Sequence, residues 1–292
     1  MRILVVGENG LLGGNVATIA DQRGATVVGT YHSVDPGFDQ PSYQLDITSR
    51  TDVEDLLNET DPDAVINCAA MTDVDGCESD PDRAHAVNAE GAEHLARAAD
   101  AIDATLIHTS TDYIFNGERD TPYPEDAVPD PQQVYGESKL AGERLVRDAH
   151  SSPLIARLSF VYGRSLPDGT LSGFPQWVRD RARSGDEIPL FTDQRITPSY
   201  AAATASTLLD LLEAGQNGTF HVASRSCVTP YEFGELLLQE IGFDDATLTE
   251  SSMTDVERDA KRPRNTCFDT TKVERTLSRP QSTLAEDLSS LL

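Results

Sequence analysis

The chain opens with the stretch Met1-Arg2-Ile3-Leu4-Val5-Val6-Gly7-Glu8-Asn9-Gly10-Leu11-Leu12-Gly13. A short apolar run is followed by glycines at every third position and then by a helical pattern. A glycine motif indicates dinucleotide binding when it lies between a strand and a helix in this way. In such a turn, glycines permit the tight bend, the approach of a pyrophosphate to the backbone, and the packing of helix on strand. The helix then offers free N–H groups and a partial positive charge to the anion. The opening stretch therefore predicts a dinucleotide site.

The spacing of these glycines is G-x-x-G-x-x-G, which differs from the commoner G-x-G-x-x-G fingerprint. Glycine-rich turns after strands are common, so the motif alone would be weak evidence. We expect Gly7, Gly10 and Gly13 to form the cofactor loop, together with the intervening residues Asn9, Leu11 and Leu12.

Apolar runs alternate with helical patterns along the rest of the chain. We expect strands at 2–6, 26–30, 63–67, 105–109 and 154–158, and helices at 11–22, 50–59, 81–101 and 134–149. This alternation predicts an α/β fold with a Rossmann-like doubly wound parallel sheet. Beyond residue 164 the pattern loosens, and there we expect helices at 175–184, 200–214, 230–241 and 283–291, with short strands at 188–191 and 219–222.

A tyrosine and a lysine, Tyr135 and Lys139, lie four residues apart in a chain that has only three lysines among its 23 basic residues. On a helix, such side chains share a face, with about 5–6 Å between their Cβ atoms. An ammonium at that distance favours tyrosinate and is expected to lower the phenol pKa from its reference of about 10. Tyr135 is therefore predicted to act as a general acid or base. The alternative is an exposed helix on which the two side chains never meet.

Hydroxyl-bearing residues follow the apolar run at 105–109, in the segment Ser110-Thr111-Asp112-Tyr113. In open α/β sheets, ligands bind beyond the carboxyl ends of the strands. A hydroxyl at Thr111 could hydrogen-bond a substrate carbonyl while Tyr135 donates a proton, so we expect Thr111 to be catalytic. The alternative is an ordinary polar turn.

Together these segments resemble an extended short-chain dehydrogenase/reductase, specifically the dTDP-4-dehydrorhamnose reductase family, over nearly the whole chain. Further matching segments are Asn67-Cys68-Ala69-Ala70-Met71-Thr72, Ser159-Phe160-Val161-Tyr162-Gly163, and Arg262-Pro263-Arg264-Asn265-Thr266. The resemblance implies a dinucleotide-binding Rossmann domain at residues 1–164 plus 192–223. It also implies a smaller substrate-binding lobe at residues 165–191 plus 224–292.

The implied activity is NADPH-dependent reduction of the C4 ketone of a nucleotide-activated 6-deoxy-4-ketohexose, such as dTDP-4-dehydrorhamnose, in deoxysugar biosynthesis. Lys139 would hold the cofactor ribose as well as act on Tyr135. Some family members form magnesium-linked dimers; a homodimer is therefore one expectation, although the sequence shows no decisive ligand set for a metal.

The resemblance also assigns cofactor contacts. Strand 26–30 ends in Thr30-Tyr31-His32-Ser33, with no acidic residue where an NAD-specific enzyme usually holds the ribose diol. This favours NADP(H) over NAD(H), although no arginine stands there either. A helix cap is the alternative role for Asp46. The remaining cofactor contacts implied are Asp46, Ile47, Asn67, Ala69, Ala70 and Tyr135.

Substrate contacts are implied as well. Relatives often have tryptophan where this chain has Phe160. Arg262 and Arg264 are expected to grip the diphosphate, because the guanidinium fork can donate two hydrogen bonds to phosphate; surface ion pairs are the alternative. The implied contacts to the sugar and nucleotide are Met71, Thr72, Asp112, Tyr113 and Phe160.

Two other functions compete with the reductase. Sugar-nucleotide dehydratases and epimerases share the fold, but similar dehydratases carry Thr-Asp-Glu where this chain has Tyr113 in place of the glutamate. A non-catalytic regulatory subunit that binds methionine adenosyltransferase also resembles these reductases. The presence of Thr111, Tyr135 and Lys139 argues against that function.

The charge of the chain is strongly negative, with 49 acidic residues against 23 basic ones and a formal net charge of −26. Because the surplus is spread along the whole length and lysine is nearly absent, the composition resembles that of a halophile protein from a high-salt cytoplasm. An ordinary acidic bacterial protein is the alternative. In either case the charge argues against binding to nucleic acid or to an anionic membrane.

Targeting and metal-binding patterns are not visible in the sequence. No signal peptide precedes the first strand, and no apolar run approaches the ~18 residues that span a bilayer, so a cytoplasmic protein is expected. The four cysteines, Cys68, Cys77, Cys227 and Cys267, show no C-x-x-C spacing and no metal pattern with the histidines. We expect them to be reduced.

The net charge predicts that salt stabilises the fold. Self-repulsion should destabilise the compact state in dilute buffer, and screening over about 3 Å at 1 M salt should relieve it. We expect the melting temperature to rise between low salt and molar KCl, measured by differential scanning fluorimetry. A flat or falling curve would contradict the high-salt interpretation.

Overall fold

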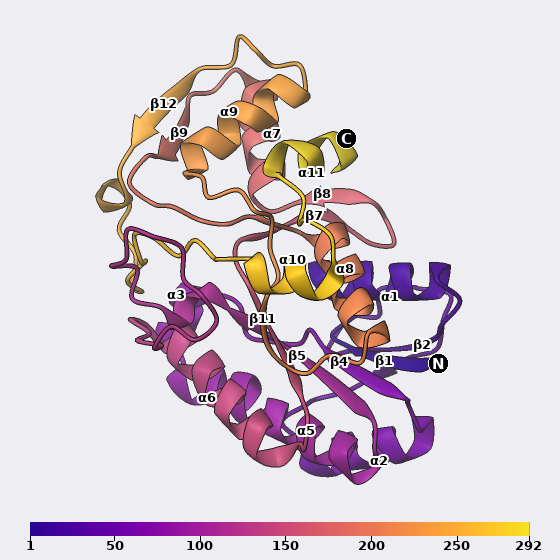
Figure 1. Cartoon of the computed structure of the whole chain (residues 1–292). Helices are drawn as coiled ribbons and strands as arrows, with labels where there is room; N and C mark the ends of the chain where they lie inside the picture. The colour runs from indigo at the N-terminus through magenta and orange to yellow at the C-terminus, as the bar shows by residue number, and fades with distance from the viewer. Residues whose placement is uncertain (292) are drawn as a thin grey trace.

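A seven-stranded parallel sheet forms the centre of the molecule (Figure 1). The computed structural model describes residues 1–291. The strand order is β11-β6-β5-β4-β1-β2-β3, and every neighbouring pair is parallel, which confirms the predicted doubly wound α/β fold. The strands are β1 (Arg2–Val6), β2 (Thr26–Tyr31), β3 (Ser42–Gln44), β4 (Ala64–Asn67), β5 (Thr105–Thr111), β6 (Leu154–Leu158) and β11 (Gly218–His221).

Helices cover both faces of this sheet because successive strand residues point to opposite sides. In β1, Ile3 and Val5 belong to one buried cluster, whereas Leu4 and Val6 belong to another. The first face is covered by α1 (Leu11–Gln22) and α8 (Ala201–Glu213); the second is covered by α2 (Arg50–Thr60), α5 (Gly91–Ala101) and α6 (Val134–Ala149).

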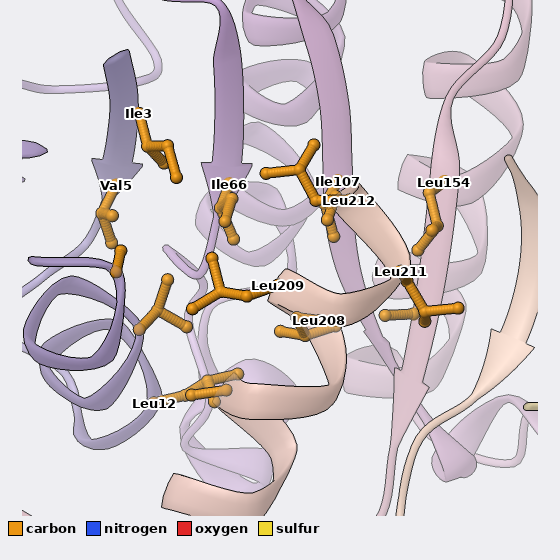
Figure 2. Close-up of a cluster of buried hydrophobic side chains, with 14 of the residues drawn as sticks. Ile3, Val5, Leu12, Ile66, Ile107, Leu154, Leu208, Leu209, Leu211 and Leu212 are labelled. Atoms are coloured by element: carbon orange, nitrogen blue, oxygen red, sulfur yellow. The ribbon is translucent and has the colours of Figure 1, made fainter. Parts of the chain in front are cut away.

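The cluster on the first face joins α1 and α8 to the strands. Figure 2 shows side chains of β1, β4, β5 and β6 directed toward leucines of the two helices. Burying each such side chain contributes roughly 1.5–3 kcal/mol, so the cluster fixes α1 firmly against the sheet. The labelled residues are Ile3, Val5, Ile66, Ile107 and Leu154 from the strands, and Leu12, Leu208, Leu209, Leu211 and Leu212 from the helices.

A second body of structure lies beyond the carboxyl ends of the strands and has a core of its own around Tyr162 and Phe233. In Figure 1, β9, β12, α7, α9 and α11 gather there. Its strands form a three-stranded sheet, β10-β7-β8, and a two-stranded sheet, β12-β9. The elements are β7 (Val161–Ser165), β8 (Thr170–Ser172), β9 (Ile188–Phe191), β10 (Ser199–Tyr200), β12 (Leu248–Ser251), α7 (Phe174–Ser184), α9 (Pro230–Glu240) and α11 (Leu284–Leu291).

The helix expected at 81–101 contains an irregularity that the sequence does not reveal. It is built from α4 (Pro81–His85), a π-helical turn η1 (Ala86–Glu90) and α5. Such turns occur frequently at functional sites. Other short elements were also not predicted, because segments this short carry too little periodicity: α3 (Val74–Ser79), η2 (Asp112–Ile114), η3 (Met253–Asp255) and α10 (Thr271–Leu277). Within residues 1–291, no helix is long and apolar enough to cross a membrane.

The prediction that all four cysteines are reduced is wrong for one pair. Cys227 and Cys267 form a disulfide, with their Cα atoms 5.5 Å apart, whereas Cys68 and Cys77 are free. The two bridged residues are 40 positions apart in sequence, so only the folded chain brings them within bonding distance. The bridge joins the loop before α9 to the segment that precedes α10.

We predict that this disulfide stabilises the fold. Closing a loop of this length should contribute about 2–4 kcal/mol to the free energy of unfolding, so Cys227→Ser should lower it by that amount in urea titrations. A reductant should have the same effect on the wild type and none on the variant. Denatured, unreduced protein should show two titratable thiols, and a count of four would contradict the bridge.

Candidate active site

A cavity of about 1040 Å³ lies where the direction of the sheet reverses. The chain runs from β1 outward to β2 and β3 and then returns to β4 on the other side of β1. Ligands of open α/β sheets bind at such a switch point, beyond the carboxyl ends of the strands. The cavity is lined by the residues that follow β1 and β4 and by the last residues of β5.

The glycine loop after β1 has the geometry that the sequence predicts. Gly7 has a φ of +82°, and a Cβ on it would lie 2.9 Å from the backbone nitrogen of Ala69. A Cβ on Gly13 would overlap the carbonyl of Gly7, so α1 can pack here only without one. Gly10 is the N-cap of α1, and no side chain caps that end. The first N–H groups of α1 are therefore available to an anion in the cavity.

Tyr135 and Lys139 lie on the first turns of α6, and both line the cavity. The Lys139 side chain is buried, and its Nζ donates a hydrogen bond to the backbone oxygen of Thr109 at 2.7 Å. Burial lowers the pKa of Lys139 to about 8, so the ammonium is the main form at neutral pH and is fixed against the end of β5.

The lowered pKa predicted for Tyr135 is not found. Burial raises the pKa of its phenol above the ordinary value, and the nearby Thr111 side chain only partly opposes this shift. The physical reason is that the cost of placing a phenolate in a buried site exceeds the stabilisation available from its neighbours. Tyr135 is therefore a neutral phenol at neutral pH, which is the form that a proton donor requires.

A buried carboxylate lies beside these groups. The Thr111 hydroxyl donates to Asp112 Oδ1 at 3.1 Å and accepts from the backbone N–H of Tyr113 at 3.2 Å. The Ser159 hydroxyl donates to Asp112 Oδ2 at 2.8 Å. Burial raises the pKa of Asp112 to about 6 even though these hydrogen bonds lower it. The carboxyl group is thus positioned by two hydroxyls at the base of the cavity.

Asn88, which lies in the π-helical turn η1, is not among the residues that the sequence predicts for the site. Its Oδ1 accepts from Met71 N at 2.8 Å, and its Nδ2 donates to Met71 O at 3.1 Å and to Ser138 Oγ at 3.0 Å. Gly142 of α6 packs so closely on the Asn88 carbonyl that a Cβ there would overlap it. Asn88 therefore connects the loop after β4 to the helix of Tyr135.

Phe160 has a backbone conformation that favours glycine, with a φ of 47°. A bulky residue with a positive φ has a strained backbone, and such strained residues are common at functional sites. Its ring lines the cavity and packs edge-on against Phe174 and Phe233, at centroid distances of 5.5 and 6.0 Å. An aromatic side chain therefore stands on the cavity wall at this position, where Phe160 is a predicted substrate contact.

The structure brings most of the predicted site residues to the cavity wall but not all of them. Asn67 lies behind the wall, where its Oδ1 accepts from Ala69 N at 3.0 Å. Arg262 pairs with Asp75 at 2.6 Å, and neither it nor Arg264 lines the cavity. The predicted residues on the wall are Gly7, Asn9, Gly10, Leu11, Leu12, Gly13, Asp46, Ile47, Ala69, Ala70, Met71, Thr72, Thr111, Asp112, Tyr113, Tyr135, Lys139 and Phe160.

Comparison with known proteins identifies the family that this chain is similar to. The chain matches the family model described as the RmlD substrate binding domain over residues 1–292. It is 52% identical over 292 residues to the "Probable low-salt glycan biosynthesis reductase Agl14" of Haloferax volcanii, which covers 100% of this chain and 97% of that protein. It is 34% identical over 264 residues to the dTDP-4-dehydrorhamnose reductase of Mycolicibacterium smegmatis, covering 90% of this chain and 76% of that protein.

Solved structures show the same relationship. The dTDP-4-dehydrorhamnose reductase of Clostridium acetobutylicum superimposes with a TM-score of 0.89 at 30% identity, covering 100% of this chain and 98% of that one. The Bacillus anthracis dTDP-4-dehydrorhamnose reductase in complex with NADP has a TM-score of 0.86 at 28% identity, covering 99% and 98%. The chain therefore belongs to the RmlD substrate binding domain family, and it is a reductase of that family.

Proposed function

We propose that the protein reduces the C4 ketone of a nucleotide-activated 6-deoxy-4-ketohexose with NADPH. The observation that carries this proposal is the meeting of Thr111, Tyr135 and Lys139 in one cavity at the switch point of the sheet. Relatives support it by name, since several are dTDP-4-dehydrorhamnose reductases. The relative from Bacillus anthracis was crystallised with NADP.

The residues of the cavity fit a dinucleotide. Gly7 and Ala69 approach so closely that a Cβ on Gly7 would have no space. The loop therefore presents backbone without a side chain to the ligand. The uncapped first turn of α1 can accept the pyrophosphate. When bound, NADPH supplies the hydride. We propose that the glycine loop, Ala69 and Ala70 hold it and that Lys139 hydrogen-bonds its ribose.

The remaining steps belong to the side chains around the ketone. Tyr135, kept neutral by burial, is the proton donor to the oxygen that becomes a hydroxyl. Thr111 polarises that oxygen, which requires its hydroxyl to exchange its hydrogen bond to Asp112 for one to the ketone. Lys139 supplies positive charge nearby while it is fixed by Thr109. Met71, Thr72, Asp112, Tyr113 and Phe160 are proposed to contact the sugar nucleotide.

The dehydratase alternative is disfavoured by Tyr113. Burial raises the pKa of this phenol to about 12, so it stays neutral at the position where dehydratases have a carboxylate. A carboxylate can remove a proton during water elimination, whereas a neutral phenol of this pKa is a poor base. Reduction requires no such second base.

A direct assay tests the proposed function and separates it from a regulatory role. Purified protein with NADPH should consume the cofactor, followed by absorbance loss, when a dTDP-4-keto-6-deoxyhexose is added. A panel that varies the nucleotide and the sugar would then define the substrate. If no 4-keto sugar nucleotide is reduced, and the protein instead binds a methionine adenosyltransferase, the enzyme proposal is overturned.

Tyr135→Phe should abolish most turnover while leaving NADPH binding nearly unchanged. General acid catalysis contributes typically about 10²–10⁴-fold, and the lost hydroxyl is a small part of the cofactor contact. Steady-state rates and NADPH fluorescence titration measure the two effects separately. Tyr231→Phe, on α9 and outside the cavity wall, is the matched control and should retain wild-type rates. Wild-type turnover in Tyr135→Phe would remove the proton-donor role.

A further inference from the structure

The wall of the cavity at the end of β2 has a feature that the sequence could not reveal. In open sheets of this kind, the residue at the end of the second strand meets the ribose that carries the adenine. Here that part of the wall comprises Tyr31, His32, Asp46 and Thr48, and it also includes Arg83. Arg83 belongs to α4, far along the chain, so the sequence at the end of β2 shows no arginine while the folded protein supplies one.

Arg83 is the one arginine that lines this cavity among the residues the structure describes. Its side chain is exposed. Across residues 1–291 its guanidinium has no ion-pair partner within 4.0 Å and donates no side-chain hydrogen bond, whereas Arg262, predicted to bind phosphate, is held by Asp75 at 2.6 Å. Arg83 is thus a cation at the cavity that is available to a ligand.

His32 lies on the same part of the wall. Its Nε2 is 4.0 Å from Asp46 Oδ2, and Arg83 also acts on the Asp46 carboxylate, whose pKa is lowered chiefly by hydrogen bonds from Thr48. Those hydrogen bonds, at 2.7 Å from Thr48 Oγ1 and 3.0 Å from Thr48 N, fix the orientation of Asp46. His32 and Arg83 therefore gather around one carboxylate at the ribose end of the cavity.

The negative charge of the whole chain makes a free cation such as Arg83 valuable for binding a phosphorylated ribose. A phosphate monoester carries about −1.5 to −2 charges at neutral pH, and the protein has a formal net charge of −26. At low ionic strength, repulsion would therefore disfavour NADP(H) relative to NAD(H) unless nearby cations compensated. A guanidinium suits this role because its fork can donate two hydrogen bonds to phosphate oxygens.

We propose that Arg83, assisted by His32, binds the 2′-phosphate of NADP(H) and thereby sets the preference for NADP(H) over NAD(H). This inference rests on the proposed function, because it takes the dinucleotide to lie with its pyrophosphate at α1 and its adenosine toward β2. It assigns the preference to a residue of α4 rather than to the end of β2.

Binding measurements on the full chain without sugar substrate test the proposal. NADPH and NADH are titrated by fluorescence at fixed KCl, and 2′,5′-ADP and 5′-AMP are used as competitors that lack the nicotinamide. Arg83→Ala should weaken the binding of NADPH and of 2′,5′-ADP by about tenfold to hundredfold, as expected for the loss of a hydrogen bond to a charged group. The affinities for NADH and 5′-AMP should change by less than about twofold, since neither ligand carries the 2′-phosphate.

Two further variants and one control variant make this test more specific. Arg83→Lys should retain part of the selectivity, because an ammonium keeps the charge but loses the planar fork. His32→Ala should weaken NADPH more than NADH, but by less than Arg83→Ala does. Arg97→Ala removes an exposed arginine of α5 that pairs with Glu93 outside the cavity; it controls for the loss of one positive charge and should leave both affinities unchanged.

Three results would overturn the proposal. Equal losses for NADPH and NADH in Arg83→Ala would show that Arg83 contacts the adenine or the shared ribose instead. Unchanged affinities for both cofactors would show that Arg83 does not contribute to dinucleotide binding. An effect of the same size in Arg97→Ala would show that only net charge matters. Because these titrations contain no sugar nucleotide, they remain decisive even if no 4-keto sugar is reduced.

Discussion

The close approach of three backbone segments at the switch point is the constraint on which the rest of the site depends. Gly13 packs on the carbonyl of Gly7, and Gly7 packs on the backbone of Ala69, with no space for a Cβ at either glycine. This contact sets the distance of α1 from β1 and β4, and the apolar cluster beneath α1 and α8 fixes it. The uncapped N-terminus of α1 and the glycine backbone of the loop therefore face the same cavity.

Tyr135 and Lys139 depend on the position of α6, and buried polar contacts help to attach α6 to the rest of the Rossmann fold. Lys139 is bonded to the end of β5, and Asn88 connects Ser138 to the loop after β4. Farther along the helix, Glu143 pairs with Arg157 of β6 at 2.8 Å; although burial opposes ionisation, the arginine holds the pKa of Glu143 at about 2. Such buried pairs add little net stability, but breaking one is costly. Their contribution here is to fix α6 in position and register against the sheet.

The surface charge and the anionic ligands place opposite demands on the protein. A chain with a net charge of −26 repels every nucleotide, yet the proposed reaction needs two of them. The cavity nevertheless offers three kinds of group to anionic ligands. These are the uncapped N–H groups of α1, the ammonium of Lys139 and the guanidinium of Arg83. Arg262, in contrast, is neutralised by Asp75. Arg83 therefore differs from Arg262 in having no ion-pair partner within residues 1–291.

The sequence by itself determined the strand–loop–helix at residues 1–22, the doubly wound sheet and the shared face of Tyr135 and Lys139. Each of these follows from local spacing: period 2 or 3.6, glycine at fixed intervals, or four residues on one helix. Only the tertiary structure decided the raised pKa of Tyr135, because desolvation depends on what covers the phenol. The contacts of Asn88 in the π-helical turn, the Cys227–Cys267 bridge and the position of Arg83 on the cavity wall near Asp46 likewise join segments that are distant in sequence. No local pattern encodes such pairings, because they arise only when the folded sheet and its helices bring the segments together.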